Sequence, residues 1–182
     1  MQPNLLQLIQ FKGQIHLITN DAELAAVANE LSMASEFGFD TETRPSFKKG
    51  EFYNTALLQL ATEEDAYLIR LRGISQFEIL KNVLEDKNVL KVGVAIRDDI
   101  KQLQKLFKFE PGNFIELQDV AKKNGLQNFG LKGMTEELLQ ARLSKAAKIT
   151  NWDARELTPA QILYAATDAW VGLKLFEKMQ RP

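Results

Sequence analysis

The chain contains no cysteine and only one histidine, His16. The missing thiols exclude disulfide bonds, a thiolate nucleophile and every cysteine-ligated zinc or iron–sulfur site. One histidine is too few for a multi-histidine metal site, and no nucleophile-elbow pattern accompanies it to suggest a Ser-His-Asp triad. His16 is followed by Leu17 and Ile18, which favours an ordinary strand residue. The chemistry that remains is carboxylate chemistry.

Long hydrophobic runs and an excess of either charge are also missing. No apolar run approaches the roughly 20 residues that a membrane-spanning helix needs, and Met1–Asn4 does not begin a secretory signal peptide. We therefore predict no membrane association and a cytoplasmic location. The 23 basic and 24 acidic side chains give a formal net charge of -1, whereas a protein that coats nucleic acid is usually basic. Any contact with nucleic acid is expected to be local.

The order of the expected elements predicts the fold class. The 182 residues are 45% apolar and contain no repeat or linker, so we predict a single domain over residues 1–182. Apolar patterns and turn residues predict strands at 15–19, 37–42, 56–61, 66–70, 89–94 and 114–117. Helices are predicted at 22–35, 77–84, 97–107, 131–139 and 158–179, and a further helix is predicted to follow the strand at 114–117 and to extend through residue 121. The second to fourth strands should form an antiparallel meander, and the whole pattern predicts a mixed α/β sheet flanked by helices.

Two acids end the apolar strand at 37–42. Side chains two residues apart on a strand point to the same face, so Asp40 and Glu42 should converge as oxygen ligands. The alternative is a polar strand end with turn chemistry. The pair alone does not decide between the two interpretations.

The last helix carries an acid on its apolar face. The helix has a sequence typical of a start with a capping box: Thr158 as N-cap, Pro159 at the first helical position and Gln161 where the box expects Glu or Gln. Tyr164 and Asp168 then lie about 40° apart on one face. A carboxylate among apolar side chains is costly unless it is paired, protonated or bound to metal, and Gly172 leaves room for a backbone or a ligand to approach. The structural alternatives are a buried aspartate that caps a loop and a core tyrosine.

The helix at 97–107 offers two adjacent acids, Asp98 and Asp99. In projection, Asp99 falls about 40° from Leu103 on the apolar stripe, whereas Asp98 falls on the far side. We therefore assign the inward role to Asp99.

Four carboxylates suit phosphodiester hydrolysis. Hard oxygen ligands without histidine or cysteine select Mg²⁺ or Mn²⁺, and two such ions nearly neutralise four carboxylates. A two-metal site generates a nucleophilic water and stabilises the leaving oxygen. Tyr164, with an ordinary pKa near 10, can orient that water but is unsuited to be the base.

Three ordered segments carry a family resemblance. The sequences FGFDTE at 37–42, KVGVAIRDD at 91–99 and YAATDA at 164–169 resemble the three exonuclease motifs of the DEDDy group of 3′–5′ exonucleases. That group includes ribonuclease D and the exonuclease domain of the Werner syndrome protein. The resemblance runs from about residue 15 to 179. It implies a ribonuclease-H-like (DnaQ-like exonuclease) fold and release of 5′-mononucleotides from the 3′ end of DNA or RNA.

The resemblance also implies roles for the site residues. Asp40, Glu42 and Asp168 would hold the metal ion on the nucleophile side, and Asp40 would bridge to a second ion. Asp99 would act through the water shell of the second ion, and Tyr164 would position the hydrolytic water. The implied cofactors are two Mg²⁺ or Mn²⁺ ions per site.

Substrate contacts and competing functions rest on weaker patterns. Arg44, Lys48 and Lys49 follow the first motif in a loop with aromatic residues, and this mixture can hold phosphates and stack on bases. The alternative is a solvated loop that covers the sheet edge. Trp152 either wedges against the terminal nucleotide or packs the last helix, and packing is favoured. Besides an active exonuclease, two functions stay open: a binding module without turnover, and a hydrolase of small nucleotides or short oligomers.

Overall fold

A six-stranded mixed sheet forms the centre of the computed structural model, which describes residues 5–145 and 147–180. Met1–Asn4 and the ends of the expected 1–182 domain lie outside the described residues. The strand order is β2-β5-β4-β3-β6-β7. The expected antiparallel meander of β3, β4 and β5 is confirmed, and the other pairings are parallel. The strands are β2 (Gln14–Ile18), β3 (Glu36–Thr43), β4 (Thr55–Ala61), β5 (Asp65–Arg70), β6 (Leu90–Gly93) and β7 (Phe114–Glu116).

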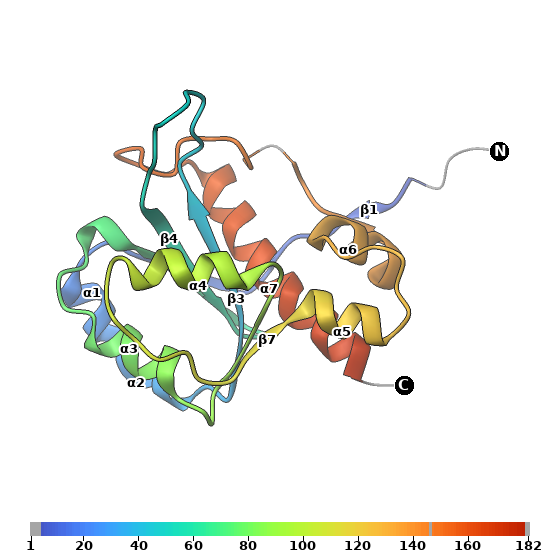
Figure 1. Ribbon diagram of the computed structural model, residues 1–182, viewed down its shortest axis with the longest axis horizontal. Coiled ribbons are helices and arrows are strands. Elements are labelled where there is room, and N and C mark those ends of the chain that lie inside the picture. The colour runs from blue at the N-terminus through green and yellow to red at the C-terminus, as the bar shows by residue number, and fades with distance from the viewer. Residues whose placement is uncertain (1–4, 146, 181–182) are drawn as a thin grey trace.

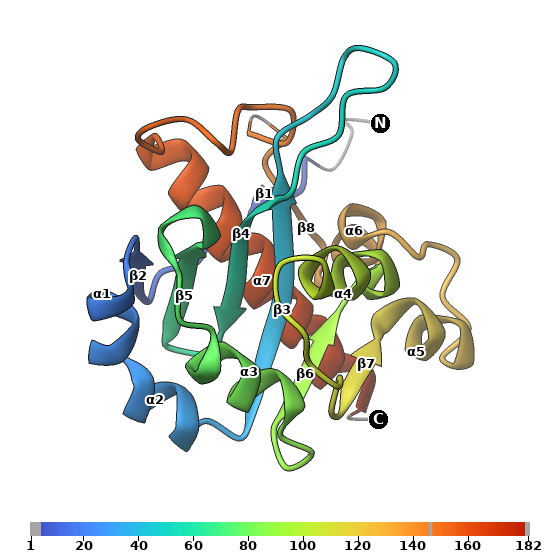
Figure 2. The same cartoon turned by 60° about the vertical axis from the view of Figure 1, so that its left-hand side comes forward.

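Helices cover both faces of this sheet (Figures 1 and 2). Side chains from one face share a core with α1 (Asp21–Ala26), α2 (Ala28–Met33), α3 (Glu78–Glu85) and α4 (Ile96–Gln104). The long helix α7 (Pro159–Gln180) crosses the opposite face, and α5 (Leu117–Lys123) and α6 (Leu131–Leu139) pack beside it. A 3₁₀ turn, η1 (Leu71–Gly73), follows β5. The predicted mixed α/β sheet with flanking helices is confirmed.

Two local features differ from the sequence prediction. The single helix expected at 22–35 is two short helices that meet at Val27, whose N–H bonds back to Leu24 only three residues earlier. Leu24 and Leu31 are both buried across this break, so the apolar pattern continues and hides it. A small parallel sheet of β1 (Gln7–Leu8) and β8 (Ala141–Arg142) was not predicted, because two residues are too short to show an alternation.

Alternation along β3 divides its side chains between the two faces. Phe37 and Phe39 are buried in the core shared with α1 to α4. Residues of the other parity face α7. They are Gly38, Asp40 and Glu42. The strand that fills one core with phenylalanines therefore presents its acids to the long helix.

Gly38 lets α7 lie directly against β3. A Cβ added at Gly38 would lie only 1.8 Å from the backbone oxygen of Ala169 on α7. Since Ala169 follows Asp168, this contact sets how closely Asp168 approaches the strand. Gly172, where the sequence led us to expect such a close approach, does not have this role: its added Cβ would meet its nearest neighbours at an ordinary 3.7 Å.

The start of α7 has the predicted capping box. The Thr158 hydroxyl accepts the Gln161 N–H at 3.1 Å, and the Gln161 side-chain oxygen accepts the Thr158 N–H at 2.9 Å. This pair fixes where the helix begins and therefore which face Asp168 occupies. Over residues 5–145 and 147–180, none of the helices combines the length and the apolar character that a membrane span requires.

Candidate active site

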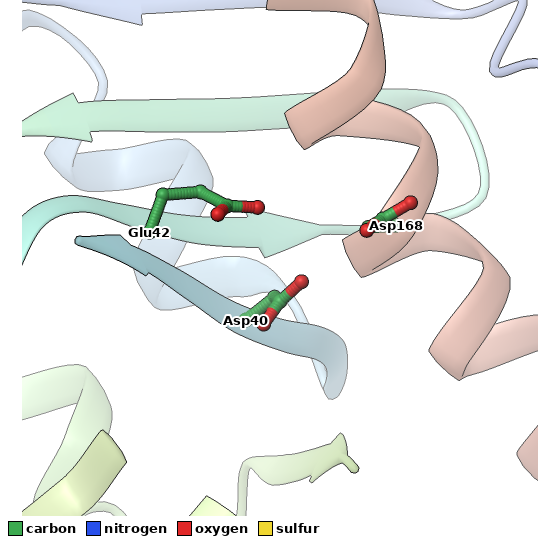
Figure 3. A group of neighbouring side chains, drawn as sticks. All are labelled: Asp40, Glu42 and Asp168. Carbon is green, nitrogen blue, oxygen red and sulfur yellow. The ribbon is translucent and has the colours of Figure 1, made fainter. Parts of the chain in front are cut away.

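Three carboxylates meet where β3 passes α7. Asp40 and Glu42 reach out from the strand and Asp168 from the helix, and one ligand oxygen of each lies within 4.8 Å of the others (Figure 3). All three residues are partly buried. The structure therefore brings together three of the four acids that the sequence singled out.

The fourth acid, Asp99, comes from the opposite layer of the sheet. It lies on the first turn of α4 and is partly buried, whereas Asp98 is exposed. This distribution agrees with the helical projection. The Thr41 side chain, between the two β3 acids in the sequence, is close enough to Asp99 to lower the pKa of that carboxyl. Asp99 is outside the group of three, yet its charge reaches both Asp40 and Glu42.

The pKa values of the four acids show that their ionised forms need a nearby cation for stability. Burial is the main cause that raises the pKa of Glu42 to about 8, that of Asp168 to about 7 and that of Asp99 to about 6. Burial also raises the pKa of Asp40 well above its ordinary value, and the charges of the other three acids add to this effect. Clustered carboxylates resist ionisation unless a positive charge joins them, and a divalent cation would supply it.

Tyr164 faces the same carboxylates from one turn earlier on α7. Burial, followed by the charges of Asp168 and its neighbours, raises the pKa of the Tyr164 hydroxyl. The hydroxyl therefore keeps its proton and is available as a hydrogen-bond donor, and it lowers the pKa of the Asp168 carboxyl. Trp152 is only 1% exposed, and its ring centre lies 6.0 Å from that of Tyr164. This burial supports the packing role of Trp152 and leaves almost no surface for a contact with a nucleotide.

Glu116 supports the helix that carries Asp99, a role that sequence reasoning missed. Its carboxylate accepts the N–H groups of Ala95 and Ile96, both at 2.8 Å, at the beginning of α4. Ala95 has a left-handed backbone, with φ of 55°, and Glu116 holds that turn. The two partners are about 20 residues apart along the chain, so no local pattern shows the interaction.

Gln59 lies in the sheet directly beside the acids and was also missed. It pairs with Asp40 in the β3–β4 register and is fully buried. Its Nε2 donates to the Ala165 carbonyl of α7 at 3.4 Å, and its amide opposes the rise in the pKa of Glu42 that burial causes. Its Oε1 has no partner among the described residues. Gln59 thus joins β4 to α7, the helix that carries Asp168, and lies beside the two acids of β3.

Three of the predicted substrate-binding residues, all basic, lie on the hairpin between β3 and β4, which projects beyond the sheet (Figures 1 and 2). Arg44, Lys48 and Lys49 are exposed, and the Arg44 guanidinium lies 4.6 Å from the ring centre of Tyr53. Arg44, Lys48 and Tyr53 line a hollow of about 470 Å³ together with Pro45, Phe47, Glu51, Ile149 and Asn151.

A cation near the acids was absent from the sequence prediction. Burial raises the pKa values of Glu42 and Asp168, and the charge of Lys148 opposes both shifts. Lys148 lies in the stretch that precedes α7, 20 residues before Asp168. A lysine in an irregular, polar stretch gives no sequence signal for this position.

The comparisons with known proteins agree with this site. Residues 15–182 match a family model described as 3′–5′ exonuclease. Over 184 residues, the chain is 33% identical to the bifunctional 3′–5′ exonuclease/ATP-dependent helicase WRN of Mus musculus, which covers 96% of this chain and 13% of that protein. Among solved structures, the Aedes aegypti Nibbler EXO domain has a TM-score of 0.83 at 26% identity, covering 92% of this chain and 87% of that one.

Escherichia coli RNase D superimposes with a TM-score of 0.80 at 30% identity, over 90% of this chain and 44% of that one. The chain therefore spans less than half the length of both WRN and RNase D. Its mixed sheet and flanking helices are the ribonuclease-H-like fold of these exonucleases. The match over residues 15–182, on a fold that brings three acids together within the reach of a fourth acid's charge, shows that the chain belongs to the 3′–5′ exonuclease family.

Proposed function

We propose that the chain hydrolyses phosphodiester bonds from the 3′ end of DNA or RNA and releases 5′-mononucleotides, with two Mg²⁺ or Mn²⁺ ions per site. One observation carries the proposal: Asp40, Glu42 and Asp168 converge within 4.8 Å of one another in a chain of the 3′–5′ exonuclease family. The charge of Asp99 reaches this group from the opposite layer. Solvated surface acids have no reason to gather across three elements of the fold.

The donor set fits hard divalent cations. It consists of carboxylate oxygens, the ligands that Mg²⁺ and Mn²⁺ favour, and the acids are too crowded to ionise together without a cation. When bound, the ions would supply an activated water and stabilise the charge on the leaving oxygen. Asp40, Glu42 and Asp168 would hold one ion, with Asp40 shared by the second and Asp99 acting through water.

Tyr164 has the position and the protonation state to orient the attacking water. Its hydroxyl lowers the pKa of the neighbouring Asp168 carboxyl, and its own raised pKa keeps the proton in place near neutral pH. In this role Tyr164 lowers the entropic cost of attack but takes no proton. Trp152 packs near the tyrosine ring and restrains it.

The β3–β4 hairpin is suited to hold a strand. Arg44, Lys48 and Lys49 offer positive charge for phosphates. Phe47 and Phe52 are 81% and 93% exposed, and exposed aromatic rings beside basic side chains can stack on bases. The hairpin begins at the end of β3 that carries Glu42. A nucleic-acid strand bound to the hairpin would therefore extend away from the carboxylates.

A digestion panel tests the proposal. The substrates are DNA and RNA strands of about 20 nucleotides, labelled at the 3′ end, with Mg²⁺, Mn²⁺ or EDTA. We expect the wild type to release labelled 5′-mononucleotides only with metal and Asp40→Ala to release none. Asp98→Ala, at the exposed neighbour of Asp99, is the matched control and should keep wild-type activity. A wild type that degrades none of these substrates contradicts the proposal.

The same panel separates the alternatives. RNase D of Escherichia coli is described as an exoribonuclease, so RNA belongs in the panel beside DNA. A hydrolase of short oligomers would cleave dinucleotides faster than strands of about 20 nucleotides. A binding module without turnover would bind strands but release nothing under any metal condition.

A further inference from the structure

A hollow of about 540 Å³ opens beside the carboxylate of Asp168. Asp168 and Tyr164 form part of its wall. Three lysines also line it, from the first turn of α6 and from the stretch that precedes α7. The complete lining is Gly130, Leu131, Lys132, Leu143, Ser144, Lys145, Lys148, Tyr164 and Asp168.

The acids near the lysines lie in two places: Lys148 acts on the carboxylates of Glu42 and Asp168, whereas Lys132 and Lys145 share Glu136. Lys132, Lys145 and Lys148 are all exposed. Lys132 is so close to Lys145 that it lowers the pKa of Lys145. The carboxylate of Glu136 is 3.9 Å from the Lys132 ammonium, a long contact within one helix turn. Like charges placed side by side are unfavourable unless an anion joins them.

The cluster of lysines is a local feature of the surface. The whole chain has a formal net charge of -1, so a general positive field does not explain three cations in one hollow. Two further features favour an anion: Gly130 is the N-cap residue of α6, and no side chain in the described part of the chain forms a capping hydrogen bond to that helix. An anion in the hollow would also lie next to Asp168. The anion can approach this carboxylate only if positive charge balances its own negative charge.

We propose that Lys132, Lys145 and Lys148 form a subsite for the backbone phosphates of a nucleic-acid strand whose 3′ end lies at the carboxylates. The inference rests on the exonuclease function proposed above and adds a second anchor for the strand, separate from the β3–β4 hairpin. Phosphate contacts fix the position of a strand without reading its bases. The subsite therefore holds the strand in place, and its loss weakens binding more than it slows the chemical step.

Binding measured without hydrolysis tests the subsite. Anisotropy of a 5′-labelled DNA strand is recorded with the Asp40→Asn protein in Mg²⁺ over a series of KCl concentrations. We expect Lys132→Gln and Lys145→Gln to weaken binding severalfold each at low salt. Each should also reduce the slope of log affinity against log salt by about 0.7, the value for one single-strand phosphate contact. The double variant should show about twice this reduction.

Lys108→Gln is the matched control. Lys108 is equally exposed but lies with Glu85 and Glu110 around a different hollow, of about 390 Å³. It should leave both affinity and slope unchanged. If the double variant keeps the wild-type slope, or if Lys108→Gln changes it as much, the subsite does not exist. Thermal unfolding of each variant checks that these exposed substitutions leave the fold intact.

Neutral linkages place the contact on the strand. A substrate with uncharged methylphosphonates at the second and third linkages from the 3′ end, which leaves the scissile linkage unchanged, should bind more weakly than the normal strand. In the double variant the same substitution should cost little more, because both changes remove one interaction. Penalties that add in full would show that the lysines contact no phosphate there and would overturn the proposal.

The result is distinguishable from failure of the exonuclease proposal. If the salt slopes depend on the lysines but the chain digests no substrate, the subsite is supported and the hydrolytic function is contradicted. Digestion by the wild type with unchanged slopes in the variants would do the reverse. In active protein, Lys145→Gln should raise KM severalfold and leave kcat within about twofold.

Discussion

Replacing Gly38 by alanine tests whether the contact between α7 and β3 sets the geometry of the site. An ideal Cβ at this position lies 1.8 Å from the Ala169 oxygen and 2.8 Å from its carbonyl carbon. An ordinary carbon–oxygen contact is about 3.3 Å, so the helix has to retreat by about 1.5 Å at this point. The overlapping atoms belong to the helix backbone, so no side-chain rotation relieves the overlap.

The expected effects follow from that displacement. Overpacking of this kind costs about 1–3 kcal/mol, so we expect the free energy of unfolding of Gly38→Ala to fall by about 2 kcal/mol. Asp168 precedes Ala169 and moves with it, away from Asp40 and Glu42. Since a misplacement of about 1 Å can cost about 100-fold in rate, kcat should fall by about 100-fold or more.

Gly172→Ala is the matched control, because it adds the same methyl group to the same helix. Its Cβ would have nearest neighbours at 3.7 Å, and alanine stabilises a helix interior by about 0.5–1 kcal/mol relative to glycine. We expect a more stable protein with activity within about twofold of wild type. Urea unfolding and release of labelled nucleotide measure both effects. Wild-type stability and turnover in Gly38→Ala would refute the reasoning.

Three further predictions concern single side chains of the site. Tyr164→Phe keeps the ring but removes the hydroxyl, so steady-state kinetics should show kcat lower by about 100-fold with unchanged Mn²⁺ affinity; an unchanged kcat argues against water positioning. Without metal, in EDTA, the pKa of Glu42 in the folded protein is about 8, above its ordinary 4.5. The free energy of unfolding of the wild type therefore decreases as the pH rises from 4.5 through 8. Thermal unfolding should then show Glu42→Gln to be more stable than wild type at pH 8, by on the order of 2 kcal/mol, and not at pH 4; equal differences at both pH values would contradict this. Glu116→Ala leaves two N–H groups of α4 without their acceptor and should cost about 1–2 kcal/mol in urea unfolding and reduce kcat through Asp99; a variant as stable and active as wild type would show that Glu116 does not hold the helix.

Local patterns were enough to predict the position of several site residues. The parity of Asp40 and Glu42 depends only on β3 being a strand, and the inward position of Asp99 depends only on the period of α4. The start of α7 was predicted because Thr158 and Gln161 bond to each other three residues apart. In each case the deciding interaction lies within one turn or one strand.

The remaining features depend on contacts between distant elements. Gly38 and Gly172 are the same residue type, and only the packing of β3 on α7 shows which one meets a backbone. Glu116 reaches Ala95 and Ile96 across two neighbouring strands of the sheet. Sequence periodicity contains no information on such pairings, so these residues were found only in the structure.

The three lysines of the hollow were missed for a related reason. Lys132 lies on α6, whereas Lys145 and Lys148 lie before α7. Each alone resembles any of the other basic residues of the chain. Only the packing of α6 beside α7 brings them to the wall that contains Asp168.

Calorimetric titration of the chain with Mn²⁺ tests most directly whether the gathered acids form a metal site. We predict that the wild type binds two ions per chain, with affinity that increases between pH 6 and pH 8 as the acids with pKa values of about 6 to 8 lose their protons. Asp40→Ala should lose this binding, whereas Asp98→Ala should retain it. Weak binding that is the same in wild type and Asp40→Ala would contradict the account.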